Sequence, residues 1–346
     1  MSLEAFRERI HQGLPLCLRG GGSKTFYGGP AQGEPLDVRD HRGIVSYEPT
    51  ELVVTARAGT PLEELEAVLA ERRQGLAFEP PAFGGAATVG GVLAAGLSGP
   101  GRPSRGAVRD FVLGVKVLDG EGRVLTFGGQ VMKNVAGFDV SRLMAGSLGT
   151  LGLILEVSFK VLPLPVAEAT LRFELSQAQA LETMNRWAAQ PLPVTATCWA
   201  EPALTVRLAG AGTAVRSACA SLGGEPVAES TAFWAALRDQ RADFFTGEAP
   251  LWRLAVPSVA APLDLEGPTL IEWGGSQRWL RGERDPAAMQ ERARRAGGHA
   301  TLFRGGDRAG AVFQTPPPPL LDLHRRLKAA FDPHRLFNRG RLFPDL

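Results

Sequence analysis

The sequence is poor in the residues that build metal centres. It has only three cysteines, far apart and in no C-x-x-C pair, and five equally scattered histidines. Iron–sulfur clusters and structural zinc sites need such ligands at close, regular spacing. We therefore expect no metal site, and the sparse cysteine usage predicts a reducing, cytoplasmic location.

Long apolar runs and one-sided charge are also missing. No stretch approaches the roughly 18 apolar residues that a membrane-spanning helix requires, and the charged segment 1–9 lacks the apolar centre of a secretory signal. The net charge is +2, and no basic run is interleaved with aromatic residues, which argues against nucleic-acid binding. A length of 346 residues predicts two domains, or one domain with a large insertion.

Glycine, in contrast, is concentrated in three clusters, all in the first half of the chain. They are 19–24 (RGGGSK), 88–99 (TVGGVLAAGLSG) and 146–152 (GSLGTLG). Glycine has no Cβ, so the backbone N–H groups of such loops can come close to a large anion. Three places of close approach predict a long ligand such as a dinucleotide rather than a single phosphate.

The first half mixes short strands and short helices. We expect a helix over 3–12, strands at 14–18, 44–47 and 52–57, a hairpin of 111–118 with 123–127, and a half-buried strand at 155–161. Thr60, Pro61 and Glu63 have the spacing of a capping box that opens a helix, and Thr88 is a natural cap for the next one.

After about residue 165 the glycine clusters stop and strands and helices alternate. Strands are expected at 171–175, on either side of Glu201-Pro202, and at 251–256, 270–273 and 299–304, with helices at 176–188, 213–222 and 286–296. This order suits a small antiparallel sheet with helices on one face. A proline-rich spacer at 314–319 and a helix at 320–331 precede the tail.

Two common nucleotide motifs do not fit the glycine clusters. A Walker A loop needs glycine directly before its lysine, but Ser23 precedes Lys24. The Rossmann fingerprint G-x-G-x-x-G occurs at no strand-to-helix turn, and no acidic residue follows at the ribose distance. Simple tight turns remain the structural alternative for each cluster.

Together, these segments resemble a known flavoprotein family. The residues that carry the resemblance are RGGGS at 19–23, PPAFGGAATVGG at 80–91, RDFVLG at 109–114, GSLGTLGLI at 146–154 and the tail FDP with FNRG at 331–340. Their order is similar to the FAD-binding domain of the vanillyl-alcohol oxidase and p-cresol methylhydroxylase superfamily (PCMH type). The segments 131–139 (VMKNVAGFD) and 271–275 (IEWGG) more narrowly resemble the smaller FAD-binding subunit of the bacterial glycolate oxidase complex.

The resemblance implies an α+β fold with three parts. Residues 1–165 would form a two-subdomain PCMH-type FAD-binding domain, 166–310 a small ferredoxin-like cap on the substrate side, and 311–346 the proline-rich spacer and a segment that returns to the flavin. One FAD would lie between the FAD domain and the cap. Because the first glycine loop lacks the histidine that tethers flavin in some relatives, we expect the FAD to be non-covalent.

The resemblance also implies which residues contact FAD. The first loop would wrap the pyrophosphate, the helix N-terminus at 88–91 would face the second phosphate or the flavin edge, 146–154 would receive the adenine end, and the tail would reach the isoalloxazine. The candidate cofactor-binding residues are Arg19, Gly20, Gly21, Gly22, Ser23, Lys24, Pro81, Thr88, Val89, Gly90, Gly91, Gly96, Ser98, Gly99, Arg109, Gly146, Gly149, Thr150, Gly152, Ile154, Asn338 and Arg341. For Arg109, an ion pair with Asp110 is the alternative, and Arg339 replaces the proline common in the family's tail motif.

Catalytic candidates are few. Relatives that oxidise 2-hydroxy acids carry several cap histidines, whereas this chain has only His299 between residues 166 and 310. Removing a proton from a 2-hydroxy acid needs a base of tuned pKa and a cation on the carboxylate. We take His299 and Arg304 as that pair, with a purely structural role as the alternative for His299. Lys133 is either a cation beside the flavin or the substrate carboxylate, or a solvated loop charge.

The function implied is that of an FAD-binding subunit of a glycolate oxidase or dehydrogenase complex, which oxidises glycolate to glyoxylate and passes electrons through FAD to an iron–sulfur partner. Its partners would be a larger FAD-containing subunit and the iron–sulfur subunit, and through them the inner face of the cytoplasmic membrane. Two alternatives stay open: a flavin-bearing relay or structural subunit whose larger partner does the chemistry, and a stand-alone FAD oxidoreductase of another substrate.

Overall fold

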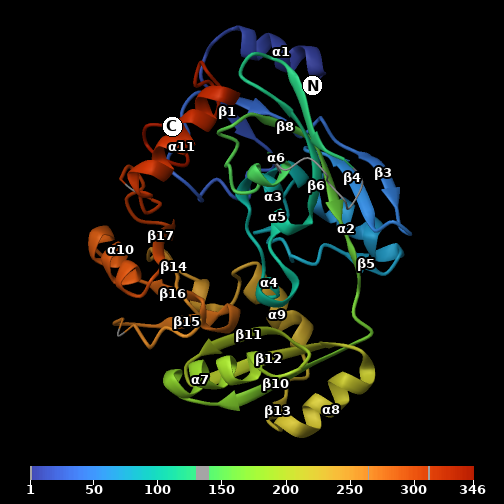
Figure 1. Cartoon of the computed structure of the whole chain (residues 1–346), viewed down its shortest axis with the longest axis vertical. Coiled ribbons are helices and arrows are strands. Elements are labelled where there is room, and N and C mark those ends of the chain that lie inside the picture. The colour runs from blue at the N-terminus through green and yellow to red at the C-terminus, as the bar shows by residue number, and fades with distance from the viewer. Residues whose placement is uncertain (1, 130–139, 264, 311) are drawn as a thin grey trace. The chain divides into compact units, whose positions relative to one another are not determined.

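The computed structural model describes residues 2–129, 140–263, 265–310 and 312–346, and the chain divides into two compact units (Figure 1). The first unit consists of Met1–Leu97, Ala107–Pro163 and Arg308–Leu346. The second consists of Ser98–Gly106 and Leu164–Asp307. The expected boundaries near 165 and 310 lie close to these divisions, but the short segment Ser98–Gly106 belongs with the second unit.

A five-stranded antiparallel sheet forms the centre of the first unit. Its strands, in spatial order, are β3 (Ile44–Glu48), β4 (Val53–Arg57), β8 (Leu153–Lys160), β6 (Val112–Leu118) and β7 (Val124–Gly128). The expected pair 44–57 and the hairpin 111–127 are therefore confirmed. The helices that pack with this sheet are α2 (Leu62–Glu71), α3 (Val89–Ala95), α5 (Val108–Phe111) and α6 (Val140–Leu143). Their apolar side chains and those of the sheet form one buried core around Val54, Leu65, Leu93 and Phe159.

A second, smaller core joins the chain's beginning to its tail. Helix α1 (Leu3–His11) packs Phe6 and Ile10 against β1 (Leu16–Arg19) and β2 (Glu34–Asp37), two parallel strands. The tail adds to this layer, because Leu16 pairs in parallel with Phe337 and donates its N–H to the Leu336 carbonyl at 2.7 Å. Short strands β5 (Gln74–Gly75) and β9 (Leu162–Pro163) and the helix α11 (Pro318–Phe331) complete the unit.

One predicted helix cap is wrong, although the helix itself begins within a residue of the expected place. Thr60 does not cap α2, whose N-cap position is Pro61 and has no side-chain cap hydrogen bond. The Thr60 hydroxyl instead bonds across to the backbone of Gly43, accepting from its N–H at 2.9 Å and donating to its carbonyl at 3.2 Å. The side chain thus ties the helix entry to the sheet edge, a non-local role that local spacing cannot reveal.

The second unit is built on an eight-stranded antiparallel sheet, larger than the small sheet expected. Its strands, in spatial order, are β13 (Glu225–Pro226), β10 (Ala167–Glu174), β12 (Ala203–Gly210), β11 (Val194–Ala200), β15 (Thr269–Glu272), β16 (Gln277–Arg281), β14 (Leu251–Ala255) and β17 (His299–Arg304). The sheet has two similar halves. Numbered along the chain within each half, the strands lie in the order 4-1-3-2, and the two halves meet where β11 pairs with β15.

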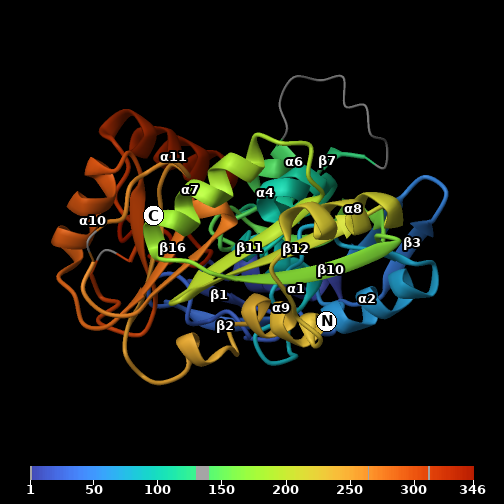
Figure 2. The ribbon, with the colours of Figure 1, turned by 90° about the horizontal axis from the view of Figure 1, so that it is seen from below.

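Helices cover the apolar face of this sheet. Helices α7 (Gln177–Ala188) and α8 (Gly212–Leu222) pack on the first half, and α10 (Pro286–Arg295) packs on the second. Helix α9 (Ser230–Arg238) lies on the other side of β10–β12 (Figure 2), where the Trp234 ring contacts Arg207. The predicted capping box of α7, Ser176 with Gln179, is confirmed. The fold is therefore α+β, as expected. None of the helices in the described parts of the chain is long and apolar enough to cross a membrane.

Candidate functional site

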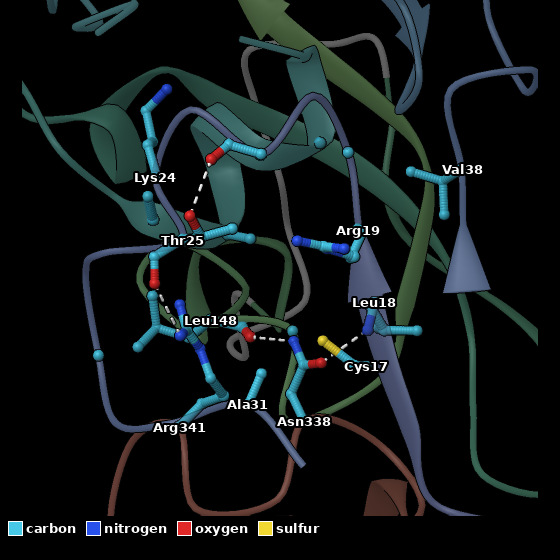
Figure 3. A pocket seen from close by; sticks show the side chains of 18 of the residues that line it. Cys17, Leu18, Arg19, Lys24, Thr25, Ala31, Val38, Leu148, Asn338 and Arg341 are labelled. Atoms are coloured by element: carbon cyan, nitrogen blue, oxygen red, sulfur yellow. Dashed lines mark hydrogen bonds between the residues drawn. The ribbon is translucent and has the colours of Figure 1, made fainter. Parts of the chain in front are cut away.

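The first unit contains a cavity of about 550 Å³ (Figure 3). Its walls come from β1 and the loop after it, the first turn of α3, the segment 148–154, Arg308 and the tail. Sites that enclose organic ligands commonly have volumes of about 300–1,000 Å³. The cavity is therefore large enough to hold much of a dinucleotide.

The cavity brings together most of the predicted cofactor-binding residues. Those that line it are Arg19, Gly20, Gly21, Gly22, Ser23, Lys24, Thr88, Gly90, Gly91, Gly149, Gly152, Ile154, Asn338 and Arg341. Those that do not line it are Pro81, Val89, Gly96, Ser98, Gly99, Arg109, Gly146 and Thr150. All three glycine clusters thus contribute, although more than a hundred residues of chain separate the first from the third.

The predicted residues that do not line the cavity have other positions in the fold. Val89 is fully buried in the core, and Gly96 ends α3 in a left-handed conformation. Gly99 belongs to the second unit, where its carbonyl accepts the Trp273 indole N–H at 3.1 Å. Arg109 is exposed and lies 3.9 Å from the Asp110 carboxylate, so the ion-pair interpretation describes its contact. Asp110 itself accepts the N–H of Ala107 at 2.8 Å.

The first glycine loop presents backbone donors to the cavity. Within the described residues, the N–H groups of Gly20, Gly21, Gly22 and Ser23 donate to no protein acceptor. A Cβ on Gly21 would lie 1.4 Å from the Ala86 carbonyl oxygen, and one on Gly20 would lie 2.3 Å from the Thr88 hydroxyl. The loop therefore passes directly against residues 86–88 and has consecutive donors for an anion.

The first turn of α3 does not offer the donors that we expected. Thr88 caps the helix as predicted, accepting the Gly91 N–H at 3.3 Å. However, Val89 donates to the Thr60 carbonyl at 2.9 Å, and Gly90 donates to the Ala58 carbonyl at 2.8 Å. These N–H groups already have acceptors, so Gly90 and Gly91 line the cavity as a wall rather than as an anion site.

Asn338 joins the three parts of the wall. Its side-chain oxygen accepts the Leu18 N–H at 2.7 Å, and its amide nitrogen donates to the Leu148 carbonyl at 2.6 Å (Figure 3). The side chain is 6% exposed. A Cβ on Gly149, whose φ is +72°, would lie 2.7 Å from the same amide nitrogen, so the tail fits closely against this loop.

Two arginines hold the loop 25–29. Arg341 donates to the carbonyls of Thr25 at 3.0 Å and Gly29 at 2.8 Å, and also to that of Tyr27. Arg308, which the sequence analysis missed, donates to the Gly28 carbonyl at 3.1 and 2.8 Å. Burial, together with the charge of Arg341, lowers the pKa of Arg308 to about 10. Two guanidinium groups so close together favour a negative ligand in the cavity.

A buried ion pair fixes the tail behind the cavity. Lys328 of α11 donates to the Asp332 carboxylate at 2.8 Å, and to the carbonyls of Thr150 and Phe337 at 2.7 and 2.8 Å. Asp332 also accepts the N–H groups of Leu336 and Phe337, each at 2.8 Å. The Lys328 and Asp332 side chains are 3% and 0% exposed. The pair therefore determines the path of the segment that carries Asn338 and Arg341.

Two of the three catalytic candidates lie far apart. His299 and Arg304 stand at opposite ends of β17, so about 16 Å separates their Cα atoms at the usual rise per strand residue. Arg304 donates to the Phe245 carbonyl at 2.8 Å. Lys133 lies outside the described residues. Among the residues that the structure describes, no group of three or more histidine, cysteine, aspartate or glutamate side chains could hold a metal ion.

Comparisons with known proteins agree with this geometry. Residues 4–128 match the family model described as an FAD binding domain. Over 344 residues the chain is 48% identical to glycolate oxidase subunit GlcE of Escherichia coli K12, covering 99% of this chain and 97% of that protein. The chain belongs to the GlcE family. It is thus a homologue of a glycolate oxidase subunit, in a family of FAD-dependent oxidoreductases.

More distant relatives match only part of the chain. Glycolate oxidase subunit GlcD of Bacillus subtilis is 30% identical over 198 residues, which are 56% of this chain and 42% of that protein. A D-lactate dehydrogenase of Archaeoglobus fulgidus is 32% identical over 159 residues, 43% of this chain and 34% of its own. Among solved structures, alkyldihydroxyacetonephosphate synthase has a similar fold, with a TM-score of 0.65 at 15% identity over 97% of this chain and 74% of the other.

Proposed function

We propose that this chain binds one FAD non-covalently in the cavity of its first unit and serves as a subunit of a glycolate-oxidising complex. In this proposal, glycolate is oxidised to glyoxylate, and the electrons pass through FAD to an iron–sulfur partner. The observation that carries it is the cavity itself: consecutive backbone donors lie at one wall, in a chain 48% identical to a glycolate oxidase subunit.

The residues present fit a dinucleotide. A pyrophosphate needs several donors at a place of close approach. The N–H groups of 20–23 provide them, and Gly20, Gly21 and Gly22 have no Cβ to interfere. Arg308 and Arg341 add positive charge, and the apolar residues Leu148, Leu153 and Ile154 suit aromatic rings. Among the residues that the structure describes, no histidine lines the cavity, which supports a non-covalent flavin.

The protein's part in the chemistry would be binding and orientation. FAD, when bound, supplies the acceptor for two electrons from the substrate's C–H bond. The first loop would hold the pyrophosphate, and Asn338 would keep the tail and the 148–154 segment at the correct spacing around the rings. The tail arginine Arg341 would keep the loop 25–29 closed over the site by binding its carbonyls.

We also propose the remaining assignments of the architecture. The first unit would be the two-subdomain PCMH-type FAD domain, and the second the cap on the substrate side. The 4-1-3-2 strand order in each half of the sheet supports a cap made of two ferredoxin-like halves. The partners would be a larger, GlcD-like FAD subunit and an iron–sulfur subunit, and through them the complex would lie at the inner face of the cytoplasmic membrane.

The visible spectrum of the purified chain tests the cofactor. We expect flavin absorption that is released into the supernatant by acid precipitation, as for a non-covalent cofactor. A colourless protein that takes up no added FAD would contradict the proposal, and flavin that stays with the precipitate would contradict the non-covalent mode.

A second candidate is a flavin-bearing relay, with substrate oxidation in the larger subunit. It is favoured by the separation of His299 from Arg304 along β17. Anaerobic addition of glycolate to the isolated yellow protein separates the two: bleaching supports oxidation by this chain, and an unchanged spectrum supports the relay. Bleaching by a different hydroxy acid alone would favour a stand-alone oxidoreductase of another substrate.

A further inference from the structure

The second unit has a cavity of its own, with a volume of about 240 Å³. Its walls come from the first turn of α7, the end of β11 and the turn after it, the start of β15, Arg278 of β16 and the segment 263–267. None of the described residues that line it also lines the cavity of the first unit. The cavity is therefore a separate candidate site that lies within one unit.

A buried cation, Arg278, forms part of the cavity wall. It lies opposite Ile271 of β15 and Leu254 of β14, and directly opposed residues share a face of the sheet. Ile271 belongs to the core under α7, and Leu254 belongs to the core under α10. Arg278 is 1% exposed, so a positive charge is buried between two apolar clusters.

The guanidinium of Arg278 has hydrogen bonds but no counter-ion in the part of the chain that the structure describes. Its Nε donates to the Gly275 carbonyl at 3.1 Å, Nη1 to the Ala261 carbonyl at 2.6 Å, and Nη2 to the Ala260 carbonyl. Since a guanidinium has five N–H donors, two have no acceptor among the described residues. Burial lowers the pKa of Arg278, and no carboxylate opposes that effect. A buried charge without a partner is costly, which favours an anion in the adjoining cavity.

The N-terminus of α7 borders the same cavity. Ser176 caps this 12-residue helix and accepts the Gln179 N–H at 3.4 Å. The Gln177 N–H donates to no acceptor among the described residues, and Gln177 lines the cavity. Trp199 fixes the helix start, because its indole N–H donates to the carbonyl of residue 175 at 2.8 Å. A helix N-terminus carries partial positive charge, so it favours the same kind of ligand as Arg278.

The rest of the wall limits the size and charge of that ligand. Leu263 and Leu265 are apolar, and Arg292 holds their segment by donating to the Leu263 carbonyl. Together with the Trp199 ring they suit a short alkyl group. Glu201, whose side chain is exposed, also lines the cavity. Its carboxylate would repel a second negative charge on the ligand, which favours a monoanion over a dianion.

We propose that this cavity binds a small monocarboxylate, with its carboxylate between Arg278 and the N-terminus of α7 and its alkyl group against Leu263 and Leu265. The inference goes beyond the proposed function, because the site lies in the second unit and requires no flavin. Short alkyl, 2-hydroxy and 2-oxo carboxylates share the chemistry that it recognises.

The test is a ligand-observed NMR titration of the purified, full-length chain with propionate. Gln177→Pro removes one backbone donor, and the first position of a helix accepts proline. We expect this variant to bind propionate at least fivefold more weakly than the parent chain. Gln177→Ala is the matched control, because it keeps the N–H group, and its affinity should stay within twofold. Circular dichroism of both variants reports on α7.

Two charged positions test the selectivity. The parent chain should bind propionate at least tenfold more tightly than malonate, a dianion of similar size, and Glu201→Gln should narrow this ratio to within about threefold. Arg278→Lys should weaken propionate binding at least tenfold. It also removes contacts to the segment 260–261, so the Gln177 variants carry the decision if it unfolds.

Three results would overturn the proposal: no binding of propionate by the parent chain, equal binding by Gln177→Pro and Gln177→Ala, or tighter binding of malonate than of propionate. Asp264, between Leu263 and Leu265 in sequence, lies outside the described residues. Binding of propionate that appears only in Asp264→Asn would mean that this carboxylate occupies the site, and it too would overturn the proposal. A colourless protein that binds propionate contradicts the flavin assignment and leaves this site standing.

Discussion

At the scale of single residues, the cavity depends on backbone that passes too closely for any side chain. Gly21 is the sharpest case, because a Cβ there would overlap the Ala86 carbonyl. The Asn338 side chain adds to the backbone pairing between the tail and the strand that precedes this loop, and it also binds the Leu148 carbonyl. Each of these residues gives a separate test of how the wall is built.

Gly21→Val should weaken FAD binding at least tenfold, because the loop must move away from residues 86–88 to accept a side chain. Fluorescence titration of the flavin-free protein with FAD measures this directly. Gly310→Ala is the matched control, since a Cβ there has no atom within 4 Å. Equal FAD affinity in Gly21→Val and the parent chain would show that the loop does not contact the cofactor.

Asn338→Leu should destabilise the protein by about 1–3 kcal/mol for each backbone group left without its partner, here the Leu18 N–H and the Leu148 carbonyl. Urea unfolding measures the loss, and FAD affinity should fall with it. Gln12→Leu, at an exposed position after α1, should change neither quantity. An unchanged midpoint in Asn338→Leu would contradict the bridging role.

The sequence predicted much of this wall but missed Arg308. The loop 19–24 and Asn338 were predicted from motifs, and the Thr88 cap from local spacing. Arg308 carries no local signal: it stands between a glycine pair and a proline-rich spacer, and its contact is with Gly28, 280 residues away. The hydrogen bonds of Val89 and Gly90 to residues 58–60 could not be predicted from the sequence either, because they join segments that are distant in sequence.

At the scale of elements, α11 and the tail act as one piece because of the buried pair Lys328–Asp332. The i,i+4 spacing of this pair is that of an ordinary surface ion pair, and the sequence offers no sign that both side chains are buried. The burial of β8 was also underestimated from the sequence. Its alternating pattern predicted a half-buried strand, but it lies between β4 and β6, and Ser158 is buried with its hydroxyl 2.8 Å from that of Thr55.

Lys328→Met should destabilise the protein by about 3–5 kcal/mol, because it leaves the Asp332 carboxylate buried without its cation. Urea unfolding followed by circular dichroism gives the value. Arg325→Met, which removes an exposed ion pair from the same helix, should have little effect. If both variants unfold at the same urea concentration, the buried pair does not hold the tail.

In the second unit every strand and helix expected from the sequence is present, but β13, β16 and α9 were not expected. The pairing of β11 with β15 was not predicted either, because these strands are about 70 residues apart and no local sequence pattern indicates that they pair. The sheet was therefore expected to be small, whereas its two halves form one continuous surface of eight strands.

At the scale of the whole molecule, three histidines have pKa values lowered in the folded state, with burial as the largest cause: His41, His299 and His324. A lowered pKa means that the unfolded chain binds protons more readily. The folded state therefore keeps its full stability above the unfolded histidine pKa of about 6.5. It loses stability as the pH falls below that value toward the lower histidine pKa values of the folded state. We expect the free energy of unfolding to be lower at pH 5.5 than at pH 7.5.

Urea unfolding at the two pH values checks this prediction, and His41→Gln should reduce the difference. The side chain of His41 packs edge-on against Phe6, with ring centres 6.0 Å apart, so its burial is structural. Stability that rises on acidification from pH 7.5 to 5.5 would contradict the assignment.

The first unit is made of three chain segments. The segments Ser98–Gly106 and Leu164–Asp307 between them belong to the second unit, and the third segment begins at Arg308. The parts of the cavity wall are therefore synthesised at different times. The glycine loop emerges from the ribosome early, but Arg308, Asn338 and Arg341 close the same cavity and are made more than 280 residues later. The whole second unit is translated in the interval. If FAD binds in this cavity as proposed, it binds after the second unit has been translated, and a nascent chain truncated before Asn338 has only part of the cavity wall.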